Sequence, residues 1–361
     1  MGFLREERRA AGRAIVRGLR KLRGIIGRPP ALPSPREIPA RILIIRPYFL
    51  GDIVLSLPVA QALRRARPDA RISWLCRAEW APLLRGQAAV DEVIAWPKSG
   101  LREWRALIRF LRRRFDLVLA LSWDRATPWI AWATGAPHRV GIEEFGRPRL
   151  SSLLHTHPIA APERTTDPRP MADFYFEPLR LMGFGAREEA PRLSPTAEQE
   201  QAVVERLGAL ADSGYLLVHP GGRLRNKRWP LERLAELLRR LNSSERPAVV
   251  LVCGPGEEAW AADLARELPP GKGAFWPSPT LEEFIALVRR ARLFLGNDSG
   301  PMHMAAAAGC RVVAVFGGDP RRWRPCGEGH RTVVGATGIE SATVEAVFEA
   351  VMQTWASAPS R

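Results

Sequence analysis

The stretch that decides the fold is ILIIRPYFLGDIVLSLPVAQALRR, residues 42–65. Four apolar residues are followed by a short turn, and the turn opens into a segment with the apolar spacing of an amphipathic helix. The turn holds the pair Gly51-Asp52. A carboxylate at such a position either caps the helix that follows or takes part in chemistry at the end of a strand. The residues alone leave both explanations open.

The same alternation of short apolar runs and helix-like segments continues on both sides of a central interruption at residues 146–195. In the first half, the pattern predicts strands at 41–46, 71–76, 92–96, 116–121 and 138–142, and helices at 53–66 and 101–114. In the second half, it predicts strands at 214–220, 248–254, 274–276, 293–296 and 311–317, and helices at 230–241, 257–268, 281–291, 300–308 and 340–355. Such alternation is typical of parallel sheets covered on both faces, and it predicts an α/β fold with two Rossmann-like halves.

A chain of 361 residues is long for one core and favours two domains of about 150 residues each. We predict five parts: a basic amphipathic extension and linker (1–36), an N-terminal Rossmann-like domain (37–150), an interdomain region (151–195), a C-terminal Rossmann-like domain (196–338) and a C-terminal helix (339–361). Ligands are expected at the carboxyl ends of the strands.

Several classes of protein are disfavoured by missing patterns. No run of about 18 apolar residues occurs, so no segment is predicted to span a membrane. The four cysteines are scattered without a CxxC pair, which indicates reduced thiols in a cytosolic setting. A P-loop, a GxGxxG after the first strand, an HExxH and a D-x-D pair are all absent. The sequence therefore predicts no P-loop ATPase, no dinucleotide redox enzyme and no metal site.

The net charge of +16 is concentrated at the N-terminus, where the first thirty residues hold nine Lys or Arg against two Glu. There Ile15, Leu19, Leu22 and Ile26 recur at helical spacing. A basic amphipathic helix suits an anionic membrane surface, and a solvated extension explains the charge equally well. Because the basic run lacks interleaved aromatics and a recognisable motif, we expect no nucleic-acid partner.

The loop HPGGRLRNKRWP follows a predicted strand in the second half. Gly221 and Gly222 let the backbone approach a ligand closely. Lys227 and Arg228 then precede a helix whose first residue is predicted to be Pro230. Cations beside helix N–H groups favour a phosphate site, and the alternative is a tight turn with solvated charge.

Two further loops of the second half carry polar residues at strand ends. In CGPGEEAW, Glu257 can accept hydrogen bonds from ribose hydroxyls, and helix capping by Glu257 or Glu258 explains the residues equally well. In GNDSGPMHMAAAAG, Asp298 or Ser299 is predicted to cap a helix of small residues, and Ser299 with Gly300 offers N–H groups to a diphosphate. His303, one turn later, faces the same region, although a lone histidine on such a helix is more often structural.

The segments ILIIRPYFLGDIVLSLPVAQALRRARPDARI, HPGGRLRNKRWPLERLAELLRRL and LFLGNDSGPMHMAAAAGCRVVAVFGGDPRRWRP together resemble glycosyltransferase family 9, the heptosyltransferases that build the inner core of bacterial lipopolysaccharide. The resemblance covers residues 41–355. It implies a GT-B architecture, in which two Rossmann-like domains face a cleft. It also implies metal-independent, inverting transfer of a heptose from ADP-heptose to a lipid A-linked sugar, without a further cofactor.

The resemblance also implies roles for individual residues. Asp52 matches the general base of the acceptor domain, Lys227 matches the phosphate-binding lysine, and Glu257 matches an acidic residue of the donor domain. The donor-diphosphate loop is matched by Asp298, Ser299 and Gly300, and His303 follows in the same motif. Secondary candidates are Gly221, Gly222 and Arg228 for the donor, and Arg46 and Gly51 for the acceptor.

The sequence departs from the family pattern in two places. The run before Asp319 is one residue shorter, and bulky Tyr48 and Phe49 stand where smaller or polar residues are expected. The expected partners are a nucleotide-sugar donor, a lipid A-linked acceptor and the cytoplasmic face of the inner membrane, bound peripherally through the basic N-terminal helix. The alternatives are another GT-B sugar-nucleotide enzyme, such as a 2-epimerase, and a non-catalytic nucleotide-sugar-binding protein at the membrane surface.

Overall fold

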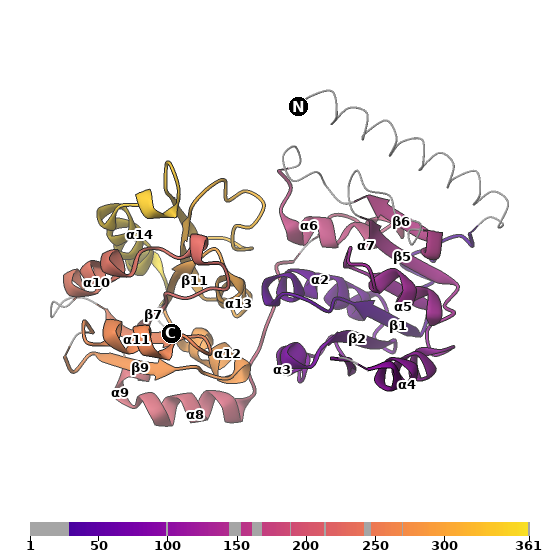
Figure 1. The fold of residues 1–361 in the computed structure, drawn as a ribbon, viewed down its shortest axis with the longest axis horizontal. Coiled ribbons are helices and arrows are strands. Elements are labelled where there is room, and N and C mark those ends of the chain that lie inside the picture. The colour runs from indigo at the N-terminus through magenta and orange to yellow at the C-terminus, as the bar shows by residue number, and fades with distance from the viewer. Residues whose placement is uncertain are drawn as a thin grey trace. The chain divides into compact units, whose positions relative to one another are not determined.

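The computed structural model describes residues 29–98, 100–143, 153–160, 168–187, 189–212, 214–241, 247–268 and 270–359. Contacts between Cα atoms divide the chain into two compact units. Unit 1 comprises Met1–Tyr48 and Ser56–Glu188, and unit 2 comprises Phe49–Leu55 and Glu189–Arg361. Each unit contains one sheet with helices packed against it (Figure 1).

The sheet of unit 1 has six parallel strands in the order β3-β2-β1-β4-β5-β6. The order reverses between β1 and β4, which is the doubly wound arrangement. Its strands are β1 (Arg41–Ile45), β2 (Arg71–Arg77), β3 (Glu92–Trp96), β4 (Leu117–Ala120), β5 (His138–Glu143) and β6 (His157–Ala160). Its helices include α3 (Ala81–Leu84), α4 (Leu101–Leu111), α5 (Thr127–Ala133), α6 (Met171–Tyr175) and α7 (Glu177–Leu181), and helix α2 (Leu50–Ala66) groups with unit 1 from Ser56 onward and with unit 2 before it.

One face of this sheet is covered by α4 and α5. Leu107 of α4 and Ile130 of α5 share a buried cluster with Leu43, Ile45 and Val118 from the central strands. All four residues of β4 are buried, as expected for a parallel strand with helices on both faces. The apolar runs of the sequence are continuous for this reason.

Unit 2 repeats the same strand order, β12-β11-β10-β7-β8-β9, again with every pair parallel. The reversal lies between β7 and β10. Its strands are β7 (Tyr215–His219), β8 (Ala248–Cys253), β9 (Gly273–Pro277), β10 (Leu293–Asn297), β11 (Arg311–Phe316) and β12 (Arg331–Val334). Its helices include α8 (Ala197–Leu207), α9 (Ala209–Asp212), α10 (Leu231–Arg240), α11 (Glu258–Ala265), α12 (Leu281–Arg290), α13 (Gly300–Ala307) and α14 (Val344–Ser357).

The core of unit 2 lies between its central strands and the helices α10 and α14. Leu237 and Val351, one from each helix, are fully buried in a cluster with Leu216, Leu295 and Val313. The two helices lie near each other in Figure 1 and contact each other. This packing fixes the ends of β7 and β10, where the loops predicted to bind the donor begin.

The structure confirms the predicted α/β class and the predicted strands, and it changes some boundaries. Helix α2 begins at Leu50 rather than at residue 53, because Phe49 takes a left-handed conformation and its carbonyl accepts the Ile53 N–H at 3.1 Å. Pro230 is the residue before α10 and not its first residue, since its ψ of 134° is extended. The predicted N-terminal helix lies outside the described residues.

None of the four cysteines, all within the described ranges, forms a disulfide. Among the residues that the structure describes, no helix is long and apolar enough to cross a membrane.

Candidate active site

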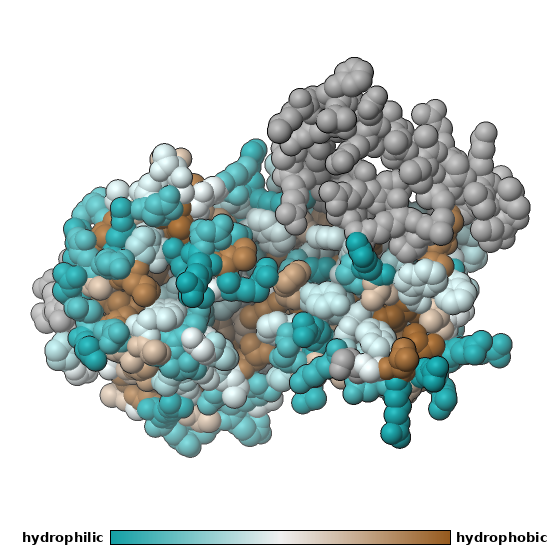
Figure 2. All heavy atoms as spheres, viewed as in Figure 1, coloured by the Kyte–Doolittle hydropathy of each residue, from teal (hydrophilic) through white to brown (hydrophobic). Residues whose placement is uncertain are grey.

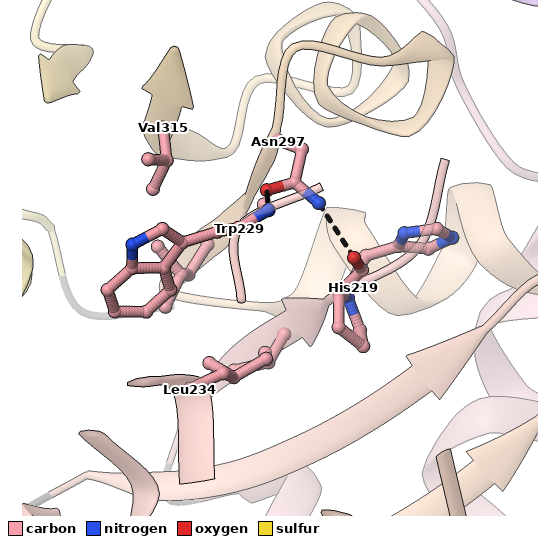
Figure 3. Close-up of a pocket in the computed structure, with 9 residues that line it drawn as sticks. His219, Trp229, Leu234, Asn297 and Val315 are labelled. Atoms are coloured by element: carbon pink, nitrogen blue, oxygen red, sulfur yellow. Dashed lines mark hydrogen bonds between the residues drawn. The ribbon is translucent and has the colours of Figure 1, made fainter. Parts of the chain in front are cut away.

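Asn297 joins the loops that follow β7 and β10, the two strands at the reversal of the second sheet. Its buried side chain accepts a hydrogen bond from the Trp229 N–H at 3.1 Å and donates to the Pro220 carbonyl at 2.7 Å (Figure 3). It also donates to the Gly221 carbonyl at 3.1 Å. Asn297 is not among the residues predicted for the site. A polar residue ending the buried run LFLGN was its signal, because a buried amide needs partners.

A small pocket lies beneath these loops. It is lined mainly by apolar groups, among them Trp229, Leu234 and Val315 (Figure 3). It has room for about one water molecule, so a nucleotide does not fit inside it. The pocket belongs to the packing that supports the loops.

Lys227 and Asp298 form an ion pair although they are 71 residues apart in the chain. The distance from Lys227 Nζ to Asp298 Oδ2 is 2.5 Å. Asp298 therefore holds the lysine beside the start of α13, whose N-cap residue is Ser299. The prediction that the side chain of Asp298 or Ser299 caps α13 is wrong, because no side-chain hydrogen bond is made at the cap position.

The start of α13 also carries the hydroxyl group of Ser299. The Ser299 hydroxyl is buried and has no hydrogen-bond partner within the described part of the chain. The N–H groups of a first helical turn point outward and carry partial positive charge. A cation, a hydroxyl and a helix N-terminus therefore meet at one strand end, which suits an anionic ligand.

Glu257 connects the loop after β8, which carries it, to the glycine loop after β7. Its Oε1 pairs with Arg228 at 2.9 Å and accepts the Gly222 N–H at 3.2 Å, and its Oε2 accepts the Gly254 N–H at 3.0 Å. A Cβ atom on Gly221 would lie 1.8 Å from Oε2, so a side chain there would displace the Glu257 carboxylate. The capping alternative for Glu257 is wrong, since its side chain makes no cap hydrogen bond to α11. Its carboxylate shapes the glycine loop instead.

Burial disfavours the charged form of two histidines in unit 2. Burial, and secondarily the charge of Lys227, lowers the pKa of His303 to about 3. Burial also lowers the pKa of His219, against the opposing effect of Glu257. His303 packs near Trp323, with ring centroids 6.5 Å apart.

These lowered pKa values predict that the protein loses stability in acid. In the unfolded chain a histidine takes up a proton below pH about 6.5, while folded His303 stays neutral down to about pH 3. The contribution of His303 is therefore complete above pH 6.5 and is lost as the pH falls. We expect His303→Gln to reduce the slope of unfolding free energy against pH, between pH 6 and 4, by about 1.4 kcal/mol per pH unit.

Urea unfolding at several pH values measures this slope. The matched control is His157→Gln, which removes a half-buried histidine of unit 1. Equal slopes for wild type and His303→Gln would contradict the neutral state assigned to His303.

Asp52 lies in the first turn of α2, with 8% of its surface exposed. Its segment, Phe49–Leu55, groups by contacts with unit 2. Within that unit Gly51 lies against His303, because a Cβ on Gly51 would lie 2.9 Å from the His303 ring. The turn that carries Asp52 therefore adjoins α13, the helix that follows the loop predicted to bind the donor diphosphate.

Two other residues singled out from the sequence form polar contacts with neighbouring side chains or carbonyls. Arg46, in unit 1, is buried and donates to the Leu121 carbonyl at 2.7 Å and to the Tyr175 hydroxyl at 3.0 Å. Asp319 is exposed and pairs with Arg321 at 2.6 Å. In the part of the chain described here, no three His, Cys, Asp or Glu side chains are placed to hold a metal ion.

Two doubly wound parallel sheets define an α/β fold of the GT-B type. Residues 104–351 match the model of glycosyltransferase family 9 (heptosyltransferase). The chain belongs to this family and is a glycosyltransferase. Arg46 and Asp52 precede the matched residues.

The chain is similar to lipopolysaccharide heptosyltransferase 3 of Escherichia coli strain K12, with 25% identity over 299 residues, 77% of this chain and 83% of that protein. Its fold is similar to that of the family 9 glycosyltransferase from Veillonella parvula (TM-score 0.77, 22% identity, 92% of this chain and all of the other). It is also similar to E. coli heptosyltransferase WaaC, solved with ADP (TM-score 0.66, 19% identity, 88% and 99% covered).

Proposed function

We propose that the protein transfers a heptose from ADP-heptose, with inversion, to a lipid A-linked sugar of the lipopolysaccharide inner core. Family membership supports the class of reaction. The names of the relatives support the sugar and the acceptor, and the ADP of the WaaC structure supports the nucleotide. The observation that carries the proposal is the Lys227–Asp298 pair beside the start of α13.

In this proposal the donor diphosphate binds Lys227 in place of Asp298. Lys227 supplies the positive charge, while the N–H groups of Ser299 and Gly300 and the Ser299 hydroxyl supply hydrogen bonds. The departing ADP gains negative charge, and these groups stabilise it in the role that other transferases give to a metal ion. We therefore expect transfer to continue when EDTA is present.

Glu257 is proposed to contact the ribose of the donor. Its two oxygens already accept two backbone N–H groups and pair with Arg228. A carboxylate has about four lone-pair sites, so acceptor capacity remains for a ribose hydroxyl. The proposed general base is Asp52, which takes the proton from the acceptor hydroxyl as the new glycosidic bond forms and the bond to ADP breaks.

Thermal unfolding with a panel of ADP- and UDP-sugars tests the donor. A ligand that binds only the folded protein stabilises it by about 2.7 kcal/mol at a hundred times its Kd. We expect ADP-heptose to raise the Tm most and ADP alone to raise it less. A preference for UDP ligands would contradict the proposed ADP-sugar donor. Conversion of the sugar without an acceptor would indicate an epimerase.

We also propose that the basic N-terminal segment binds the cytoplasmic face of the inner membrane. Its charge and apolar spacing support this partner. If the chain without residues 1–30 binds anionic vesicles as well as the full chain does, this role is excluded.

A further inference from the structure

The helices α4 and α5 of unit 1 carry large apolar side chains on their outer side. The exposed fractions are 76% for Leu101, 44% for Phe110, 56% for Trp129 and 54% for Trp132. The two tryptophan rings stand edge to face, 6.4 Å apart. Figure 2 shows hydrophobic atoms among hydrophilic ones where Figure 1 places α4. Apolar groups gathered in this way mark an interaction surface.

Arginines surround these apolar groups. Residues 101–114 hold six Arg against one Glu. Arg102, Arg105 and Arg109 are exposed on α4, and Arg112 and Arg113 are exposed just beyond its end. None of these five forms an ion pair with a residue in the described ranges. By contrast, exposed Arg239 and Arg266 of unit 2 do have acidic partners.

The arginines of α4 form one stripe between exposed apolar side chains. At 3.6 residues per turn, Arg102, Arg105 and Arg109 fall within about 60° of one another, with Leu101 on one side and Phe110 on the other. The charge of α4 is therefore flanked on both sides by apolar contacts. This pattern complements a plane of phosphates over an apolar layer.

A pocket continues the charged region. Arg113 and Arg114 line it together with Arg41 and Arg71. Its volume of about 210 Å³ is large enough for a phosphate group. Three of these arginines are partly neutralised by Asp116 or Glu92, whereas Arg113 has no ionic partner in the described chain.

We propose that the α4–α5 surface docks on an anionic lipid bilayer. This surface consists of four apolar residues and five arginines: Leu101, Phe110, Trp129, Trp132, Arg102, Arg105, Arg109, Arg112 and Arg113. Tryptophan is enriched at the level of the lipid headgroups, and its amphipathic ring suits that layer. Arginine binds phosphate through its planar fork. The surface shares no residue with the loops of unit 2 that are proposed to bind the donor, so its test does not depend on the proposed transfer reaction.

Tryptophan fluorescence of the full chain tests this contact. Vesicles of phosphatidylcholine and phosphatidylglycerol carry brominated acyl chains, which quench only tryptophans that enter the bilayer. Residues 1–28 contain no tryptophan, so binding by the N-terminal segment alone gives no quenching. We expect wild type to be quenched and Trp129→Phe/Trp132→Phe to lose most of that quenching. The control Trp80→Phe/Trp355→Phe should keep it.

Removal of the arginine charges on α4 tests whether the partner is an anionic lipid surface. Arg102→Gln/Arg105→Gln/Arg109→Gln should weaken binding to anionic vesicles by about a hundredfold at low salt, since each basic residue near the surface adds about fivefold. Arg239→Gln/Arg266→Gln/Arg331→Gln removes the same charge from exposed positions of unit 2 and should weaken it far less. Near-ultraviolet circular dichroism confirms folding of each variant.

Two results would overturn the proposal. The first is unquenched wild type, or equal quenching of wild type and Trp129→Phe/Trp132→Phe. The second is equal binding to neutral and anionic vesicles with no effect of the α4 triple variant, which would leave a different partner for this surface.

Discussion

Asp52→Asn should lower the rate of sugar transfer by about a thousandfold while changing the affinity for ADP by less than about twofold. The amide keeps the size of the carboxylate and can still accept a hydrogen bond, but it cannot take up the proton of an acceptor hydroxyl. Asp52 is largely buried in the first turn of α2. The measurement compares kcat, from product detected by mass spectrometry, with ADP affinity from calorimetry.

The alternative for Asp52 is a purely structural role at the start of α2. In that case Asp52→Asn would be nearly neutral, and Asp52→Ala would cost about 1 kcal/mol of stability without a specific effect on kcat. Thermal unfolding of both variants separates the two roles. Unchanged transfer by a folded Asp52→Asn protein would contradict the proposed base.

Most of the fold could be predicted because central parallel strands are apolar on both faces. The run YLLVH of β7 is fully buried and is easily recognised. The edge strands β6 and β12 were missed, since most of their side chains are half-exposed or exposed and neither HPIA nor RTVV forms an apolar run. Helix α5 was missed because TPWIAWA is apolar on its exposed side as well as on its buried side.

The site was predicted as separate loops and not as a set of contacts. Lys227 and Asp298 were each assigned to the donor, but their pairing depends on β7 lying beside β10, which no local pattern reports. The same holds for Glu257, whose partner Gly222 is 35 residues away. For Glu257, the sequence left a ribose contact and a helix cap equally open, because local spacing reports only on neighbouring residues.

The Lys227–Asp298 pair leads to the second large effect. Lys227→Met removes the only cation of the pair and leaves the Asp298 carboxylate beside the proposed diphosphate position. We expect ADP affinity to fall by about ten- to a hundredfold, because a charge-assisted bond is lost and a repulsion is added. Transfer should fall further than affinity, since the leaving group gains charge in the transition state.

Asp298→Asn in the Lys227→Met background separates these two causes. The double variant should recover part of the ADP affinity, because the repulsion is gone, but it should not recover transfer, because the cation is still missing. Arg225→Met is the matched control, since it removes an exposed cation from the same loop and should change affinity by less than about threefold. One outcome would contradict phosphate binding by Lys227. In it, Lys227→Met lowers the Tm, the double variant restores the Tm, and the ADP affinity of both variants equals that of wild type. Lys227 would then be only a structural partner of Asp298.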